Sequence, residues 1–147
     1  GRRTRDLRVT DARALYRAWV LEHDKAPHNE GRLDVPTHSA RGSNPLCGDR
    51  VDVELQVEGE RIARVAFASR GCAIAKASAS KMTTLIEGRS PEEARALATR
   101  LEHLLERGNT EDDERLADLL GARAFPSRTR CATLAWTTLV DALRGKA

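Results

Sequence analysis

The sequence predicts an α+β fold in which helices pack on one face of a small antiparallel three-stranded sheet. Apolar and polar residues alternate over residues 51–57, which is typical of a strand with one face in water. After a turn that contains glycine, residues 61–69 continue this alternation, whereas the chain from residue 73 onward has the spacing of helices. Strands followed by helices favour helices gathered on one face of the sheet. Two strands alone are marginally stable, so we expect a third.

The first part of the chain supplies a helix and a long loop before these strands. Apolar residues recur at helical spacing over residues 11–23, and we expect the segment before them, residues 1–10, to be flexible. Residues 24–46 contain several loop-forming residues and predict a loop with one short strand around residues 33–35. Nothing marks a domain boundary later in the chain, so residues 11–147 are predicted to form a single domain.

Four helices are predicted in the second half of the chain. The strongest start is at Ser90-Pro91, because serine caps a helix well and proline is tolerated in the first turn. Gly88 ends the helix before it. The predicted helices cover residues 73–87, 91–106, 111–120 and 132–144.

Composition limits the classes of function. The 147 residues are enough for one domain with its own core. The net charge of +3 comes from 25 basic and 22 acidic residues, and only residues 1–8 form a basic run. An acidic protein partner fits this charge balance as well as a nucleic acid does, but no basic face with stacking aromatics is visible, so we expect no nucleic-acid partner. No stretch approaches the roughly 18 apolar residues of a membrane helix, and no secretion signal is visible, so a cytoplasmic protein without membrane contact is expected.

The three cysteines are the candidates for chemistry, and their odd number argues against a closed disulfide framework. Cys72 and Cys131 lie at predicted helix N-termini, where a thiolate is stabilised. Cys47 lies in a turn, two residues before Asp49. If these segments converge, three thiolates and one carboxylate could hold a tetrahedral zinc ion. Buried, inert cysteines and a turn-forming aspartate are equally compatible with the spacing.

Three motifs occur in an order that resembles a known family. They are NPLCGD at residues 44–49, GCAIAKASAS at residues 71–80 and RCATLAW at residues 130–136. Together they resemble the IscU-like (NifU N-terminal) family of iron–sulfur cluster assembly proteins over residues 12–144. Arg130 stands where an IscU scaffold usually has histidine, and the segment between residues 88 and 128 is longer than in IscU. Both features resemble the SufU branch.

This resemblance implies a zinc-dependent sulfurtransferase that accepts persulfide sulfur from a SufS-type cysteine desulfurase for iron–sulfur cluster assembly. Cys47 would accept the sulfur, and Arg128 would balance the negative charge of the ligands. An IscU-like scaffold, which assembles a cluster on the same ligands and passes it to other assembly proteins, is the alternative. A purely structural zinc site is the third possibility. The ligands implied in each case are Cys47, Asp49, Cys72 and Cys131.

Some residues depart from the family pattern or carry weaker signals. Asp24 and His28 replace a tyrosine and an arginine of the family's N-terminal motif, and Lys76 replaces a small polar residue. These substitutions lie on the surface expected to bind the partner, so the sequence does not identify which desulfurase binds. Ser78 and Ser80 have no visible base partner and are expected to serve helix packing. The four histidines are expected to be solvated rather than to bind metal.

Overall fold

The computed structural model describes residues 9–45, 48–107 and 126–145, together with the single residues 116, 119 and 122. In the helical residues 9–16, 107 and 126–128 it describes the backbone alone. The predicted flexible segment therefore lies largely outside the described residues, as does most of the predicted helix at residues 111–120.

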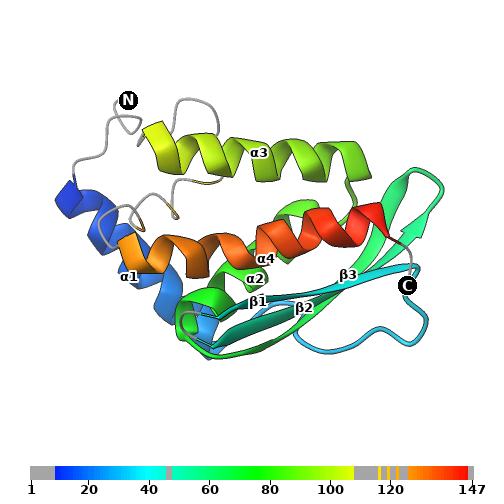
Figure 1. Ribbon diagram of the computed structural model, residues 1–147, viewed down its shortest axis with the longest axis horizontal. Helices are drawn as coiled ribbons and strands as arrows, with labels where there is room; N and C mark the ends of the chain where they lie inside the picture. Colours follow the sequence, from blue (N-terminus) through cyan, green and yellow to red (C-terminus); the bar gives the residue numbers. More distant parts are fainter. Residues whose placement is uncertain are drawn as a thin grey trace.

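The protein has the predicted α+β fold, with a three-stranded antiparallel sheet and helices on one face (Figure 1). The strands follow one another in the order β1-β2-β3 across the sheet. The elements in chain order are α1 (Val9–Lys25), β1 (His38–Asn44), β2 (Asp49–Glu58), β3 (Arg61–Arg70), α2 (Ala73–Ile86), α3 (Pro91–Arg107) and α4 (Pro126–Arg144). None of the described helices is long and apolar enough to cross a membrane.

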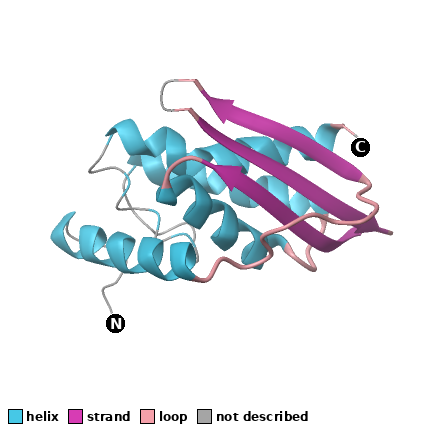
Figure 2. Ribbon diagram, turned by 90° about the horizontal axis from the view of Figure 1, so that it is seen from below, coloured by secondary structure: helices cyan, strands magenta, loops and turns pink. Residues whose placement is uncertain are grey.

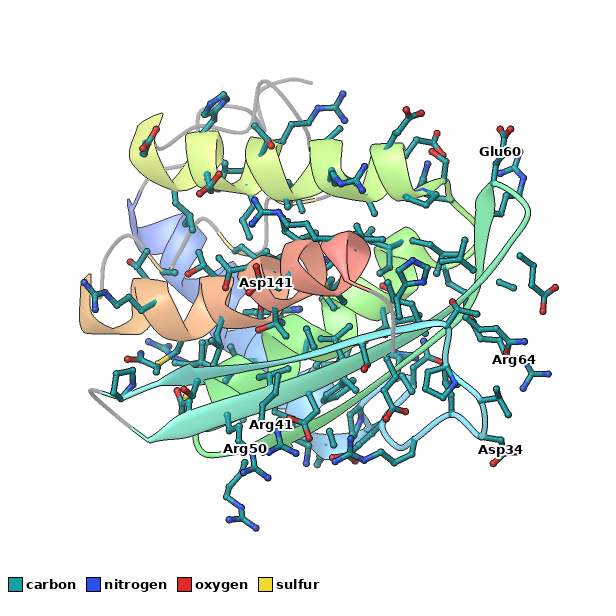
Figure 3. The ribbon with its side chains drawn as sticks, turned by 45° about the vertical axis from the view of Figure 1, so that its right-hand side comes forward. Asp34, Arg41, Arg50, Glu60, Arg64 and Asp141 are labelled. Atoms are coloured by element: carbon teal, nitrogen blue, oxygen red, sulfur yellow. The ribbon has the colours of Figure 1, made fainter. Side chains whose placement is uncertain are left out.

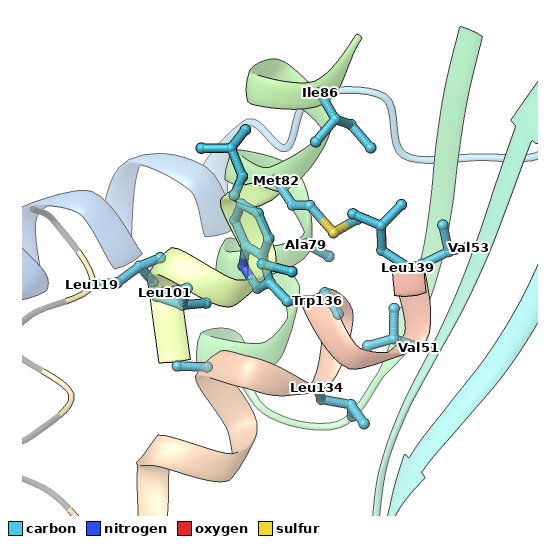
Figure 4. Close-up of a cluster of buried hydrophobic side chains, with 14 of the residues drawn as sticks. Val51, Val53, Ala79, Met82, Ile86, Leu101, Leu119, Leu134, Trp136 and Leu139 are labelled. Atoms are coloured by element: carbon cyan, nitrogen blue, oxygen red, sulfur yellow. The ribbon is translucent and has the colours of Figure 1, made fainter. Parts of the chain in front are cut away.

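The alternation in the sequence decides which face of the sheet the helices cover. Val51, Val53 and Leu55 of β2 point inward and are fully buried, while the residues between them point to the opposite face. Helices α2 and α4 lie directly on the inner face, α1 packs against α2, and α3 packs against α4 (Figure 2). Side chains of α2, α4 and β2 gather in one apolar cluster (Figure 4).

The third strand is not where the sequence predicted it. Residues 33–35 lie in a loop, where the Leu33 amide donates a hydrogen bond to the Glu54 carboxylate at 2.7 Å. The strand is β1 instead, and it lacks apolar alternation because α4 passes close to its inner face. A side chain at Gly42 would overlap with the Thr138 hydroxyl of α4. Glycine at this position permits the contact with α4, but it gives no sequence pattern that would predict a strand.

The last helix begins earlier than predicted, at Pro126 rather than near residue 132. Proline at the first helical position was the signal for this start. Cys131 is therefore the sixth residue of α4, and the prediction that it lies at the helix N-terminus was wrong. By contrast, α3 starts as predicted: the Ser90 hydroxyl accepts the Glu93 amide at 3.1 Å, and the Glu93 carboxylate accepts the Ser90 amide at 2.9 Å.

Candidate metal centre

Three of the predicted ligands meet at one end of the sheet. Asp49 is the first residue of β2, Cys72 precedes the first turn of α2, and Cys131 lies in the second turn of α4. One carboxylate oxygen and the two sulfur atoms all lie within 4.8 Å of one another. Only 1% of Asp49 and 2% of Cys131 is exposed, whereas Cys72 is half-buried. The fold thus gathers residues from three distant segments into one shielded cluster.

Asp49 is held against the turn that leads from β3 into α2. Its Oδ1 accepts the backbone amide of Cys72 at 2.8 Å, and its Oδ2 accepts the Cys72 thiol at 3.3 Å. Gly71 makes this approach possible, because a side chain there would overlap with the carboxylate and the Cα atom of Asp49. Its φ of +127° also lies in a region that favours glycine.

Cys72 caps the N-terminus of α2, as the sequence predicted. Its sulfur accepts the backbone amide of Ala75 at 3.5 Å, so the thiol faces the free N–H groups of the first turn. This end of the helix carries the positive end of the dipole, which suits a negatively charged metal ligand. The position of Cys72 therefore supports metal binding.

A buried serine links the helices that carry the two cysteines. Ser78 of α2 donates a hydrogen bond to the Ala132 carbonyl of α4 and accepts one from Trp136 Nε1 at 3.2 Å. Because Ala132 follows Cys131, these bonds set the position of Cys131 along the face of α2. The sequence predicted only helix packing for Ser78; a serine in an alanine-rich helix, with a tryptophan in the opposite helix, was the available signal.

We predict that Ser78→Ala lowers both stability and zinc affinity. The substitution leaves the indole N–H of Trp136 buried without its acceptor, which costs about 1–3 kcal/mol, and it loosens the register between α2 and α4. Chelator competition would measure zinc affinity, and thermal denaturation would measure stability. Thr84→Ala is the matched control, because that hydroxyl bonds within the exposed side of the same helix. Unchanged zinc affinity in Ser78→Ala would show that the serine stabilises the core without positioning Cys131.

His23 departs from the expectation that the histidines are solvated. It is buried, and its Nδ1 lies 2.7 Å from the Ser80 hydroxyl, which also accepts the His28 amide at 2.8 Å. Ser80 therefore ties α1 and the loop after it to α2. No histidine of the described chain joins the Asp49–Cys72–Cys131 group.

Of the two remaining predicted site residues, the structure describes only the backbone of Arg128. Cys47 lies outside the described residues, between the exposed Pro45 and Gly48. The Gly48 amide donates to the Asn44 carbonyl at 2.8 Å, so the described residues on both sides of Cys47 are tied together. The backbone of Arg128 lies in the first turn of α4, and its side chain is outside the description.

The donor set fits a thiophilic metal ion. Ligand atoms about 2.3 Å from a tetrahedral zinc ion lie about 3.8 Å apart, so donors within 4.8 Å of one another need only small shifts to share one ion. Sulfur ligands favour zinc or iron–sulfur chemistry over magnesium or calcium. Three donors from the described residues leave one tetrahedral position for a further ligand.

Comparison with known proteins shows which family the chain resembles. Residues 15–144 match the family model of the NifU-like N terminal domain. The chain belongs to this family. It is 37% identical to the iron–sulfur cluster assembly scaffold protein IscU of Streptococcus pyogenes, over 90% of this chain and 85% of the relative. It is 34% identical to the zinc-dependent sulfurtransferase SufU of Bacillus subtilis, over 85% of this chain and 86% of the relative.

Two solved structures share the fold as well. The putative iron–sulfur cluster assembly scaffold protein for the SUF system from Fervidobacterium islandicum superposes with a TM-score of 0.79 at 25% identity, over 88% of this chain and 97% of that chain. A protein solved as hypothetical superposes with a TM-score of 0.80 at 38% identity, over 90% of this chain and 98% of that chain. The resemblance inferred from the motifs is thus confirmed, and the relatives are iron–sulfur cluster assembly proteins of both the scaffold and the sulfurtransferase type.

Proposed function

We propose that this NifU-like protein is a zinc-dependent sulfurtransferase that accepts persulfide sulfur from a SufS-type cysteine desulfurase onto Cys47. The sulfur then serves iron–sulfur cluster assembly. The observation that carries the proposal is the convergence of Asp49, Cys72 and Cys131, whose donor atoms lie within 4.8 Å of one another. Cys47 would complete the set of four ligands.

The covalent chain keeps Cys47 close to this centre. Consecutive Cα atoms are about 3.8 Å apart, so the Cα atom of Cys47 lies within roughly 7.6 Å of that of Asp49. The residues on both sides of its turn, Pro45 and Gly48, are exposed. Cys131, by contrast, is buried, and the Cys72 thiol is bonded to Asp49. We therefore assign to Cys47 the role of the cysteine that both reaches the metal and meets a partner.

The proposed reaction is a thiol exchange without net oxidation. The Cys47 thiolate attacks the terminal sulfur of the donor persulfide, the S–S bond of the donor breaks, and the donor thiolate leaves. The terminal sulfur keeps its proton and ends on Cys47 as a new persulfide. Bound zinc would hold the ligand thiols deprotonated at neutral pH. We assign to Arg128, three residues before Cys131, the role of balancing the surplus negative charge of the ligands.

A scaffold function is the second candidate. The Streptococcus relative is named a scaffold protein IscU, and cysteine sulfurs are the usual ligands of iron–sulfur clusters. Arg130, at the place where an IscU scaffold usually has histidine, favours the sulfurtransferase.

The purified wild-type protein distinguishes the two. For the sulfurtransferase we expect a colourless protein with one zinc ion per chain that stimulates cysteine turnover by its desulfurase and gains sulfur on Cys47, detected by mass spectrometry. A brown protein with reconstitutable cluster absorption and no stimulation of the desulfurase would instead support the scaffold. Loss of stimulation after chelation of zinc, with recovery on adding zinc back, would link the activity to the metal.

A further inference from the structure

Each segment that meets at the metal centre carries an arginine beside its site residue. We call these three the rim arginines: Arg50 after Asp49, Arg70 before Gly71-Cys72, and Arg130 before Cys131. Arg70 and Arg130 are exposed, and 40% of the Arg50 side chain is exposed. Each of the three segments that form the centre therefore carries an arginine next to its site residue.

Two of the rim arginines face each other on the open side of the sheet. Arg50 and Arg70 are direct partners in the β2–β3 register. Their positions alternate with inward-pointing residues, so both side chains belong to the face that the helices leave open, and Figure 3 shows Arg50 extending from it beside Arg41. Like charges directly opposite one another destabilise a sheet. The fold thus tolerates an unfavourable pair at this place.

The nearby acid does not neutralise this charge. The carboxylate of Asp52 forms ion pairs with Arg32 at 2.8 Å and with Arg41 at 3.0 Å, while the Arg50 guanidinium is 4.0 Å away. Burial raises the pKa of Asp52, but the hydrogen bonds from Arg32 and Arg41 lower it by more, so the pKa lies below its usual value and the carboxylate stays ionised. Its negative charge is already shared by these two arginines. The other two rim arginines make no ion pair with any residue that the structure describes. A surplus of positive charge remains around the centre.

A protein interface centred on the metal site is wide enough to include the positions of the rim arginines. A typical interface covers about 800 Å² on each partner, which corresponds to a disc with a radius of roughly 16 Å. Rim arginines one or two residues from a site residue have Cα atoms within about 8 Å of it along the chain. An interface of this size around the centre extends over the end of the sheet that carries these arginines, and carboxylates on the partner would complement their charge there.

Resting on the proposed function, we propose that the rim arginines dock an acidic surface of the sulfur-donating desulfurase. Such complementary charges accelerate association and fix the orientation in which the donor persulfide meets the centre. A single-stranded nucleic acid would fit less well, because the open face of the sheet near the centre presents arginine, serine, alanine and aspartate and no aromatic side chain for base stacking.

Charge reversal tests the surface. We would measure binding of the zinc-loaded protein to its desulfurase by surface plasmon resonance at low and high salt, using the double variant Arg50→Glu/Arg70→Glu and the single variant Arg130→Glu. Each reversal is expected to slow association about tenfold and to weaken the salt dependence seen in the wild type. Arg64→Glu is the matched control, an exposed arginine of the same strand and face at the far end of the sheet (Figure 3). Arg70→Lys, which keeps the charge, should bind like the wild type.

The outcomes separate this inference from the proposed function. Rim variants that bind the desulfurase as the wild type does, or an Arg64→Glu variant that loses binding equally, would overturn the docking surface even if sulfur transfer proceeds. Rim-dependent docking without any sulfur transfer would support the surface and overturn the sulfurtransferase. A short single-stranded oligonucleotide serves as a second probe, and binding that depends on the rim arginines to this probe but not to the desulfurase would also overturn the inference.

Discussion

Replacing Cys47 by serine is expected to abolish sulfur acceptance while the protein stays folded. A hydroxyl is a far weaker nucleophile than a thiolate, so stimulation of the desulfurase should fall to the level of the desulfurase alone. The described residues that flank this segment, Pro45 and Gly48, are exposed, so we expect the substitution to leave the packing of the core unchanged. Cysteine turnover with and without the variant measures the first effect, and thermal denaturation the second.

The other two cysteines provide the contrast for this experiment. Cys131→Ser removes a buried ligand and should lose both the metal and much of the stability, since a polar group replaces sulfur in a buried position. Cys72→Ser should also lose zinc. If Cys47→Ser stimulates the desulfurase as well as the wild type, then Cys47 is not the acceptor; if it unfolds, the site is structural.

Replacing Gly71 by alanine is expected to empty the metal centre without touching a ligand. The new methyl group would overlap with the Asp49 carboxylate and backbone, and alanine is strained at a φ of +127°. The aspartate must therefore move away from Cys72. The backbone strain alone costs about 1–3 kcal/mol, and we expect the variant to be purified with far less than one zinc ion per chain. Elemental analysis of the protein measures this loss.

Gly59→Ala is the control that separates strain from displacement of the ligand. Gly59 has a φ of +64° in the turn between β2 and β3, and a Cβ atom at this position would have no neighbour within 4 Å among the described residues. Its replacement should lower stability through backbone strain but leave zinc content unchanged. Equal zinc loss in both variants would mean that the metal responds to general destabilisation rather than to the position of Asp49.

The sequence predicts those parts of the fold that depend on local patterns. Strands β2 and β3 follow from alternation because one face is buried and the other solvated, and α3 follows from its capping residues. Strand β1 was misplaced because its inner face is built from small residues that accommodate α4, and the start of α4 was hidden in a polar segment. The first error concerns packing between distant elements, which local patterns do not encode, whereas the second overlooked a local signal, the proline at the first helical position.

Local patterns also predict only part of the candidate metal centre. The helix N-terminus at Cys72 was predictable from the glycine and the helical segment around it. The meeting of Cys72 with Asp49 and Cys131 was implied by the family resemblance and not by spacing. Ser78 was recognised only as a packing residue, because its bond to the Ala132 carbonyl depends on how α4 lies against α2.

The separation of these residues along the chain has a consequence for biosynthesis. Asp49 and Cys131 are 82 positions apart (131 − 49) and come together only when α4 lies on the sheet. Closing so long a segment carries an entropic cost that local elements do not repay. A nascent chain that still lacks its last helix therefore has no complete set of donors, and we expect metal capture to follow translation of α4. Loading with metal would then mark the molecules that have finished folding.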